Sequence, residues 1–271
     1  MIKLIASDLD DTLLDSELRI SQENKDAVRD ALAQGMVFTI ATGRMFQSAA
    51  PYAVELGLDE QQPLICYNGA LIKRLSGETL YERFLSTDVS LAVVEYGMQQ
   101  GWTVNVYYED ELYVSEINQN VENYAAIAQV DVKAVGDLRK FIADGGKRLA
   151  KILIPGPADQ SPARSQALRR LVGPEVEIAC SKPEYVEITS LNTHKGRALQ
   201  WLAEFMGVRR EEVLVIGDGN NDVTMLEMAG IGVAVGNASQ QAKKAAGFVT
   251  STNLEHGVAR AIRQFALADR D

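Results

Sequence analysis

Short runs of continuously apolar residues alternate with amphipathic segments towards both ends of the chain. These runs predict buried strands at residues 3–7, 36–41, 64–67, 213–217, 232–235 and 248–250. The segments between them predict helices, the first of which follows Ser21, a favourable N-cap residue, and stops near Gly35. Uninterrupted apolar strands separated by helices are typical of a parallel sheet with both faces covered.

The middle of the chain has a different pattern, in which turn signals separate alternating segments. It predicts hairpins at 71–84 and 102–115, helices at 118–128 and 160–172, and strands at 149–154, 175–180 and 184–189. Such a mixture is typical of an α+β module. We therefore predict an α/β fold: a Rossmann-like parallel-sheet core, residues 1–83 and 183–271, interrupted by an inserted α+β domain at 84–182.

Polar motifs stand where core strands end or helices begin. They are Asp8-Leu9-Asp10-Asp11-Thr12, Thr42-Gly43-Arg44, Lys195, and Gly217-Asp218-Gly219-Asn220-Asn221-Asp222. Ligands of open parallel sheets bind at the carboxyl ends of the strands, so we expect these four motifs to converge on one crevice. Taken singly, each motif could also be a polar turn, a strand exit or a surface lysine.

The residue types in the four motifs indicate phosphoryl-transfer chemistry. Carboxylates with water molecules suit Mg²⁺, and the absence of an accompanying His or Cys cluster argues against zinc. A cation and a lysine can offset charge on phosphoryl oxygens, and a carboxylate can itself be the nucleophile that forms an aspartyl-phosphate.

Composition and charge argue against several classes of protein. The chain of 271 residues carries 27 basic and 37 acidic residues, a net charge of −10, which argues against nucleic-acid binding. We predict that the basic residues Lys147, Arg148 and Lys151 are solvated. Cys66 and Cys180 form no metal-binding pair, so we predict buried free thiols in a reducing compartment. We find no secretion signal and no membrane span, and therefore expect a cytoplasmic protein without a membrane partner.

The four motifs, in kind and in order, resemble those of the haloacid dehalogenase (HAD) superfamily. Within it, the chain resembles the Cof-type sugar-phosphate phosphatases with a C2 (type B) cap. The resemblance extends to Tyr67-Asn68-Gly69-Ala70 and to residues 232–238 and 253–259, and so covers nearly the whole chain. It implies that the insertion is a cap that closes over the crevice and chooses the substrate. The chain departs from the family at His256, where an acid is frequent, and at Asp11, where glycine is also common.

The resemblance also implies a mechanism. Asp8 would attack phosphorus, and Asp10 would protonate the leaving oxygen and then activate water. Asp8, the carbonyl of Asp10, and Asp218 would bind Mg²⁺.

Further residues of the motifs receive roles in substrate binding or support. Thr42 and Lys195 would hold the phosphoryl group with the Gly43 backbone, and Asn221 would contact phosphate. Asp222 would orient Lys195 or the metal shell. Arg44 is expected among the substrate-binding residues, although by itself it suggests a structural or rim charge. Asn68 is expected as a supporting residue in a mainly structural turn.

Three alternatives compete with a phosphatase of sugar phosphates. A phosphomutase would place its cap between the first two motifs, where residues 13–41 leave no room. A phospho-switch or binding protein would lack an acid two residues after the phosphorylated aspartate, so Asp10 is the discriminating residue. A phosphatase acting on pyridoxal phosphate, FMN or nucleotides stays open beside sugar phosphates. The expected partner is a small phosphorylated metabolite; the sequence indicates neither its identity nor an oligomeric state.

Overall fold

The chain divides into two compact units that are not contiguous in sequence. The computed structural model describes residues 1–268, apart from the side chains of Ser181 and Lys182. The core unit comprises Met1–Tyr81 and the chain from His194 onward, and the inserted unit comprises Glu82–Thr193. The predicted α/β architecture with a parallel-sheet core is confirmed.

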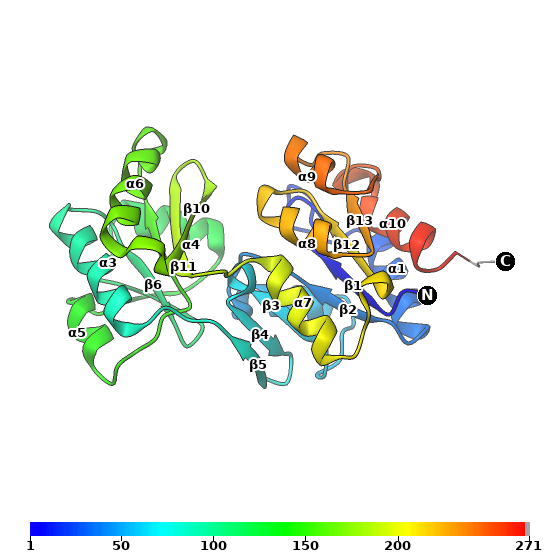
Figure 1. Ribbon diagram of the computed structural model, residues 1–271, viewed down its shortest axis with the longest axis horizontal. Coiled ribbons are helices and arrows are strands. Elements are labelled where there is room, and N and C mark those ends of the chain that lie inside the picture. The colour runs from blue at the N-terminus through cyan, green and yellow to red at the C-terminus, as the bar shows by residue number, and fades with distance from the viewer. Residues whose placement is uncertain (269–271) are drawn as a thin grey trace. The chain divides into compact units, whose positions relative to one another are not determined.

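The core unit is built on a parallel sheet of five strands (Figure 1). Its strands are β1 (Leu4–Ser7), β2 (Val37–Ile40), β12 (Val213–Gly217), β13 (Ile231–Ala234) and β14 (Phe248–Val249). They lie in the order β14-β13-β12-β1-β2, and every neighbouring pair is parallel. The strands that precede three of the predicted motifs, β12, β1 and β2, are therefore adjacent, and their carboxyl ends meet at one edge.

Helices cover both faces of this sheet. They are α1 (Gln22–Ala33), α2 (Phe46–Glu55), α7 (Lys195–Phe205), α8 (Val223–Met228), α9 (Gln240–Ala245) and α10 (Gly257–Phe265). Helix α1 packs with α10, whereas α8 packs between α7 and α9 (Figure 1). As predicted, α1 is capped by Ser21, whose hydroxyl accepts a hydrogen bond from the Asn24 N–H at 3.3 Å.

The predicted third strand contacts the parallel sheet but belongs to a second, smaller sheet. Strand β3 (Pro63–Cys66) meets the parallel sheet at a bridge between Ala41 and Ile65, and the hydroxyl of Thr39 on β2 donates to the Pro63 carbonyl at 2.8 Å. It forms a separate three-stranded sheet with β4 (Leu71–Arg74) and β5 (Thr79–Glu82), which is the hairpin expected around Gly77. A turn, Tyr67–Gly69, connects β3 to β4.

The inserted unit contains a six-stranded sheet in the order β10-β11-β9-β6-β7-β8. Its elements are α3 (Thr87–Gln99), β6 (Asn105–Tyr108), β7 (Glu111–Val114), α4 (Gln119–Ala128), β8 (Val132–Ala134), α5 (Leu138–Ala143), β9 (Lys151–Pro155), α6 (Ser161–Val172), β10 (Val176–Lys182) and β11 (Tyr185–Ser190). Apolar side chains of one sheet face, such as Val106 and Ile152, form a core with helices α3, α5 and α6.

Several further details differ from the sequence-based expectations. The inserted unit extends to Thr193 rather than 182, because β11 pairs with both β10 and β9. Lys151 is not solvated but 3% exposed, with its ammonium 3.2 Å from the carboxylate of Glu187 on the neighbouring strand. Both cysteines are free, but only Cys66 is buried, whereas Cys180 is exposed. Residues 269–271 of the predicted core lie outside the described residues.

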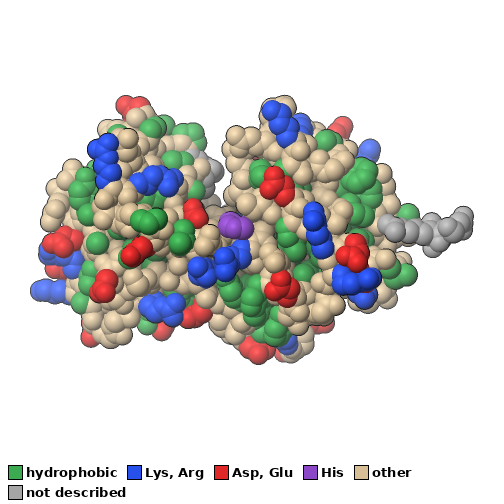
Figure 2. All heavy atoms as spheres, in the orientation of Figure 1, with side chains coloured by type: hydrophobic (Ala, Val, Ile, Leu, Met, Phe, Trp, Pro, Cys, Tyr) green, Lys and Arg blue, Asp and Glu red, His purple; other side chains and the backbone are tan. Residues whose placement is uncertain are grey.

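The lengths of the helices and the distribution of surface charge are relevant to membrane and nucleic-acid binding. Within residues 1–268, no helix combines the length and the apolar character needed to cross a membrane. On the face shown in Figure 2, basic and acidic side chains are interspersed on each unit. Such mixing gives that face no extended basic stripe of the kind that binds nucleic acids.

Candidate active site

The first motif continues β1 beyond the end of the sheet. The Asp8 N–H donates to the carbonyl of Ile216 at 2.9 Å, so the nucleophile candidate is held by the neighbouring strand β12. Asp8 is 6% exposed. Asp11 then adopts a left-handed conformation, with φ 57°, which turns the chain. This turn brings the Thr12 hydroxyl to 2.7 Å from Asp218 Oδ1, to which it donates a hydrogen bond.

Lys195 is the central cation of the site. It is the first residue of α7 and is completely buried. Its ammonium donates to Asp8 Oδ1 at 2.7 Å and to Asp222 Oδ1 at 2.6 Å. Burial lowers the pKa of Lys195, but the two carboxylates outweigh this effect, so that the net pKa lies above its ordinary value. Lys195 is therefore a permanent positive charge against the candidate nucleophile.

Asp222 serves to hold this arrangement together. Its Oδ2 accepts hydrogen bonds from the N–H groups of Asp218 at 2.9 Å and Gly219 at 2.8 Å, while its Oδ1 faces Lys195. A Cβ on Gly217 would lie only 2.8 Å from this carboxylate, so glycine at the end of β12 makes room for it. Both oxygens of Asp222 are thus engaged within the protein, which makes it a positioning group.

Three acids form a tight cluster at the ends of β1 and β12. Carboxylate oxygens of Asp8, Asp218 and Asp222 all lie within 4.8 Å of one another. Burial, reinforced by Asp222, raises the pKa of Asp8 well above its usual range, and burial also raises the pKa of Asp218. Ionised carboxylates in such a place require a compensating cation beyond the single lysine. Because both oxygens of Asp222 are engaged, Asp8 and Asp218 are the side chains best placed to hold it.

The second motif lies beside the first. Thr42 is completely buried, and its Oγ1 accepts a hydrogen bond from the Arg44 N–H at 3.1 Å. The Arg44 guanidinium pairs with the Asp10 carboxylate, with Nε 2.9 Å from Oδ2 and Nη2 2.5 Å from Oδ1. It also lies over the ring of Tyr52, 5.4 Å from the centroid. Arg44, predicted as a rim or substrate-binding charge, therefore contacts the candidate acid–base residue directly.

The fourth motif reaches the second through an amide pair. The Asn221 side chain donates to Asn68 Oδ1 at 3.1 Å. Asn68 lies in the turn after β3, where its own N–H donates to the carbonyl of Thr42 at 3.0 Å. The structure thus brings all four predicted motifs together within the core unit.

Three partnerships at this site were not predicted from the sequence: Thr12 with Asp218, Arg44 with Asp10, and Asn68 with Asn221. Each joins residues that lie far apart in the chain. No spacing rule in a single sequence signals such pairs, although the predicted convergence of the motifs on one crevice is consistent with the first of them.

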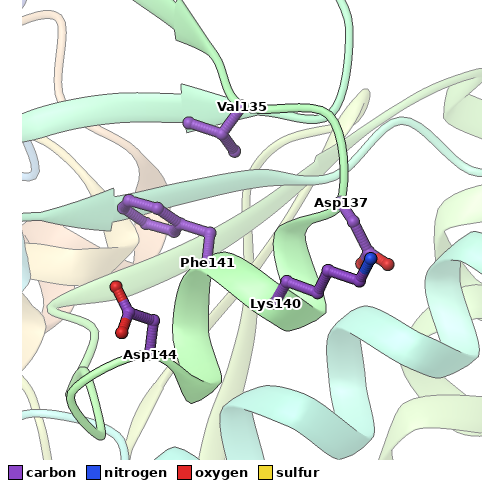
Figure 3. A pocket seen from close by; sticks show the side chains of 5 residues that line it. All are labelled: Val135, Asp137, Lys140, Phe141 and Asp144. Carbon is purple, nitrogen blue, oxygen red and sulfur yellow. The ribbon is translucent and has the colours of Figure 1, made fainter.

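The inserted unit carries a pocket of its own, of about 500 Å³. Figure 3 shows the side chains that line it, from Val135, Asp137, Lys140, Phe141 and Asp144. None of these belongs to the predicted motifs. The carboxylate of Asp137 is already engaged, because it caps α5 and pairs with an arginine of that helix. This pocket lacks the cluster of acids and buried lysine that distinguishes the core unit's site.

Known proteins resemble the chain over nearly its whole length. A sequence model of the haloacid dehalogenase-like hydrolases matches residues 5–262. The 5-amino-6-(5-phospho-D-ribitylamino)uracil phosphatase YcsE of Bacillus subtilis is 32% identical over 267 residues, which cover 98% of this chain and 96% of that protein.

Solved structures agree with the sequence comparisons. A haloacid dehalogenase-like hydrolase from Bacteroides thetaiotaomicron superposes with a TM-score of 0.90 at 32% identity, covering 97% of this chain and 99% of its own. The protein BT1666 from the same organism, studied among the phosphatases of the HAD superfamily, gives a TM-score of 0.84 at 26% identity, covering 99% and 96%.

Proposed function

The chain belongs to the haloacid dehalogenase-like hydrolases, and from this premise we propose that it is a phosphatase of small phosphate monoesters that works through an aspartyl-phosphate on Asp8. The observation that carries the proposal is the buried ammonium of Lys195, placed between the carboxylates of Asp8 and Asp222 and beside Asp218. This arrangement holds a fixed positive charge against the carboxyl group of the candidate nucleophile, and the same charge is available to an incoming phosphate.

The donor set of the site fits Mg²⁺ as the cofactor. The cluster of Asp8, Asp218 and Asp222 offers oxygen atoms only, which hard divalent cations prefer. We propose that Asp8 and Asp218 hold the ion with the carbonyl of Asp10. When bound, the ion would neutralise charge on the phosphoryl oxygens. The hydrogen bond from Thr12 to Oδ1 would orient the Asp218 carboxylate for this role.

The chemical steps then fall to two carboxyl groups. An oxygen of Asp8 attacks phosphorus, the bond between phosphorus and the ester oxygen breaks, and Asp10 gives its proton to that oxygen. Asp10 next takes a proton from a water molecule, which attacks the phosphorus of the aspartyl-phosphate. The bond to Asp8 breaks, and phosphate and free Asp8 are released. Lys195 and the Thr42 hydroxyl, both buried, bind the phosphoryl oxygens during these steps.

The substrate class is proposed from the relatives. The Bacillus enzyme named above acts, by its name, on a phosphate carried by a ribityl chain. A phosphorylated sugar or polyol is accordingly our first candidate, and pyridoxal phosphate, FMN and nucleotides are the others. We propose that the inserted unit, Glu82–Thr193, is a cap that selects among them. Exchanging this unit for that of a relative should exchange the substrate preference.

A phospho-switch on the same core is the alternative. It would require a long-lived phosphorylated Asp8. The acid two residues later, Asp10, argues against this, because a side chain able to activate water shortens the life of the aspartyl-phosphate.

The test is phosphate release from a panel of monoesters, with Mg²⁺ and with a chelator. Wild type should hydrolyse at least one ester in the presence of metal, and Asp8→Asn should abolish turnover, because the amide keeps the shape but is not a nucleophile. Asp30→Asn, the same change at an exposed site on α1, serves as the control and should leave turnover intact. Turnover that survives in Asp8→Asn, or that the chelator leaves unchanged, would contradict the proposal.

A further inference from the structure

The turn between β3 and β4 contacts the site although it carries no charged group. It comprises Tyr67, Asn68 and Gly69, whose φ angles of 52°, 54° and 99° are all in the left-handed range. Asparagine tolerates this conformation better than most residues, but for Tyr67 it is costly and persists only where the surroundings impose it. The surrounding contacts therefore hold this turn, and with it the side chain of Asn68, in a fixed position.

The backbone of the turn is tied to the second motif. The Tyr67 N–H donates to the carbonyl of Arg44 at 2.9 Å, and the Asn68 N–H donates to the carbonyl of Thr42 at 3.0 Å. These two bonds flank Gly43, the residue whose backbone is proposed to face the phosphoryl group. The position of the turn and the position of the Thr42–Arg44 segment are therefore coupled.

The side chain of Asn68 links the second motif to the fourth. Its Oδ1 accepts the hydrogen bond from Asn221 Nδ2 at 3.1 Å. A Cβ on Gly43 would lie 3.1 Å from this same oxygen and 3.3 Å from Nδ2, so the amide rests against the Gly43 backbone. Asn68 thereby sets the distance between Gly43 and Asn221.

The same turn also packs against the start of α7, which carries the third motif. A Cβ on Gly69 would lie 2.6 Å from the carbonyl oxygen of His194, the residue immediately before Lys195. Only glycine allows this approach together with a φ of 99°. One short turn thus contacts the second and fourth motifs and the residue that immediately precedes the third.

From these contacts we propose that Asn68 is a positioning residue of the phosphate subsite, which orients the amide of Asn221 against Gly43 so that both meet the phosphate together. The proposal rests on the proposed phosphatase function. Asn68 acts through Asn221, so its contribution should vanish when the Asn221 amide is absent. The contribution of Asn68 to binding should also be the same for bound phosphate and for the transition state, because both have the phosphate oxygens that the Asn221 amide would contact.

The test is a double-mutant cycle with Asn68→Gly, Asn221→Ala and the two combined. Glycine removes the amide and tolerates the left-handed backbone. Each single variant should lose about tenfold in kcat/KM, the worth of one hydrogen bond, with the loss in KM rather than kcat. The double variant should lose no more than Asn221→Ala alone. Gln129→Gly, an exposed amide at φ 54°, is the matched control and should change nothing.

A second readout needs no turnover. The stabilisation of each variant by inorganic phosphate, followed by thermal unfolding in the presence of Mg²⁺, reports affinity directly. Asn68→Gly should weaken the apparent affinity for phosphate about tenfold relative to wild type. A merely structural role would lower the unfolding temperature and leave this affinity unchanged.

The outcomes separate the two proposals. Effects of the single variants that multiply in the double variant, or an unchanged phosphate affinity in Asn68→Gly, would overturn the positioning role while an active wild type retains the proposed function. A wild type that binds phosphate with the expected coupling but hydrolyses no ester would overturn the function alone. A wild type that neither binds phosphate nor hydrolyses esters would overturn both.

Discussion

Replacing Lys195 by methionine should expose how strongly the site depends on one buried charge. Methionine matches the length and apolar stem of lysine but removes the ammonium that contacts Asp8 at 2.7 Å and Asp222 at 2.6 Å. Three carboxylates within 4.8 Å would then remain without an internal cation. Removing one partner of a buried ion pair costs about 3–5 kcal/mol, because the remaining charge is left uncompensated.

Thermal unfolding should report this cost. At about 2–4 °C per kcal/mol, the unfolding temperature of Lys195→Met should fall by roughly 6–20 °C in the absence of divalent cations. Added Mg²⁺ should restore part of the loss, since it supplies positive charge to the same carboxylates. Phosphatase activity should fall by at least about 10²-fold, as expected for loss of a group that stabilises transition-state charge. Lys244→Met, the same change on the exposed side of α9, should unfold like the wild type.

A Lys195→Met variant that unfolds at the wild-type temperature without metal would contradict this expectation. A complete lack of stabilisation by Mg²⁺, in both wild type and variant, would contradict it as well. The first result would mean that the carboxylates do not depend on the lysine, and the second that they do not bind the cation.

Further predictions concern other parts of the molecule. Thr12→Val should weaken Mg²⁺ affinity by about 10–100-fold, measured by metal titration, because it removes the hydrogen bond that orients Asp218. The hydrogen bond from Arg209 holds the pKa of Glu212 at about 2. The stabilising contribution of ionised Glu212 is therefore present above its ordinary pKa and is lost as the pH falls towards 2. Glu212→Gln should make the unfolding free energy less dependent on pH in this acid range, and an unchanged dependence would contradict the assignment. In the inserted unit, Lys151→Met should cost about 3–5 kcal/mol by denaturant titration, since it strands a buried carboxylate, and a loss below 1 kcal/mol would show that this pair is not structural.

The parallel core could be predicted because its signals are local. An apolar run such as Val213–Gly217 identifies a buried strand by itself, and a polar motif directly after it lies at the strand's carboxyl end. Adjacency of β12, β1 and β2 then follows from the pairing, and the motifs converge. The predicted roles of their residues are carried by the family resemblance and await experiment.

Features that were not predicted, such as the burial of Lys151, depend on contacts between distant segments. Lys151 reads as one of three basic residues near the surface, and only the pairing of β9 with β11 reveals the carboxylate that buries it. Helix α3 was not predicted, although Ser86 caps it, because its valines also suit a strand. The extension of the inserted unit to Thr193 likewise follows from sheet pairing rather than from composition.

One departure from the family pattern receives a physical explanation. Asp11 has a φ of 57°, the left-handed conformation that glycine adopts without cost. Aspartate tolerates this region better than most residues. Its carbonyl is additionally held by the side-chain amide of Asn237 at 2.7 Å, which helps to keep the turn after Asp10 in place.

The most direct test of the account is to trap the phosphorylated nucleophile. Asp10→Asn should slow the hydrolysis of the aspartyl-phosphate, so that an activated ester with a good leaving group phosphorylates the enzyme faster than water releases it. After an acid quench, mass spectrometry should find one phosphoryl group per chain, on the peptide that contains Asp8, and none in the double variant Asp8→Asn/Asp10→Asn. A phosphoryl group on another residue, or none at all in a variant that still releases phosphate, would contradict Asp8 as the nucleophile.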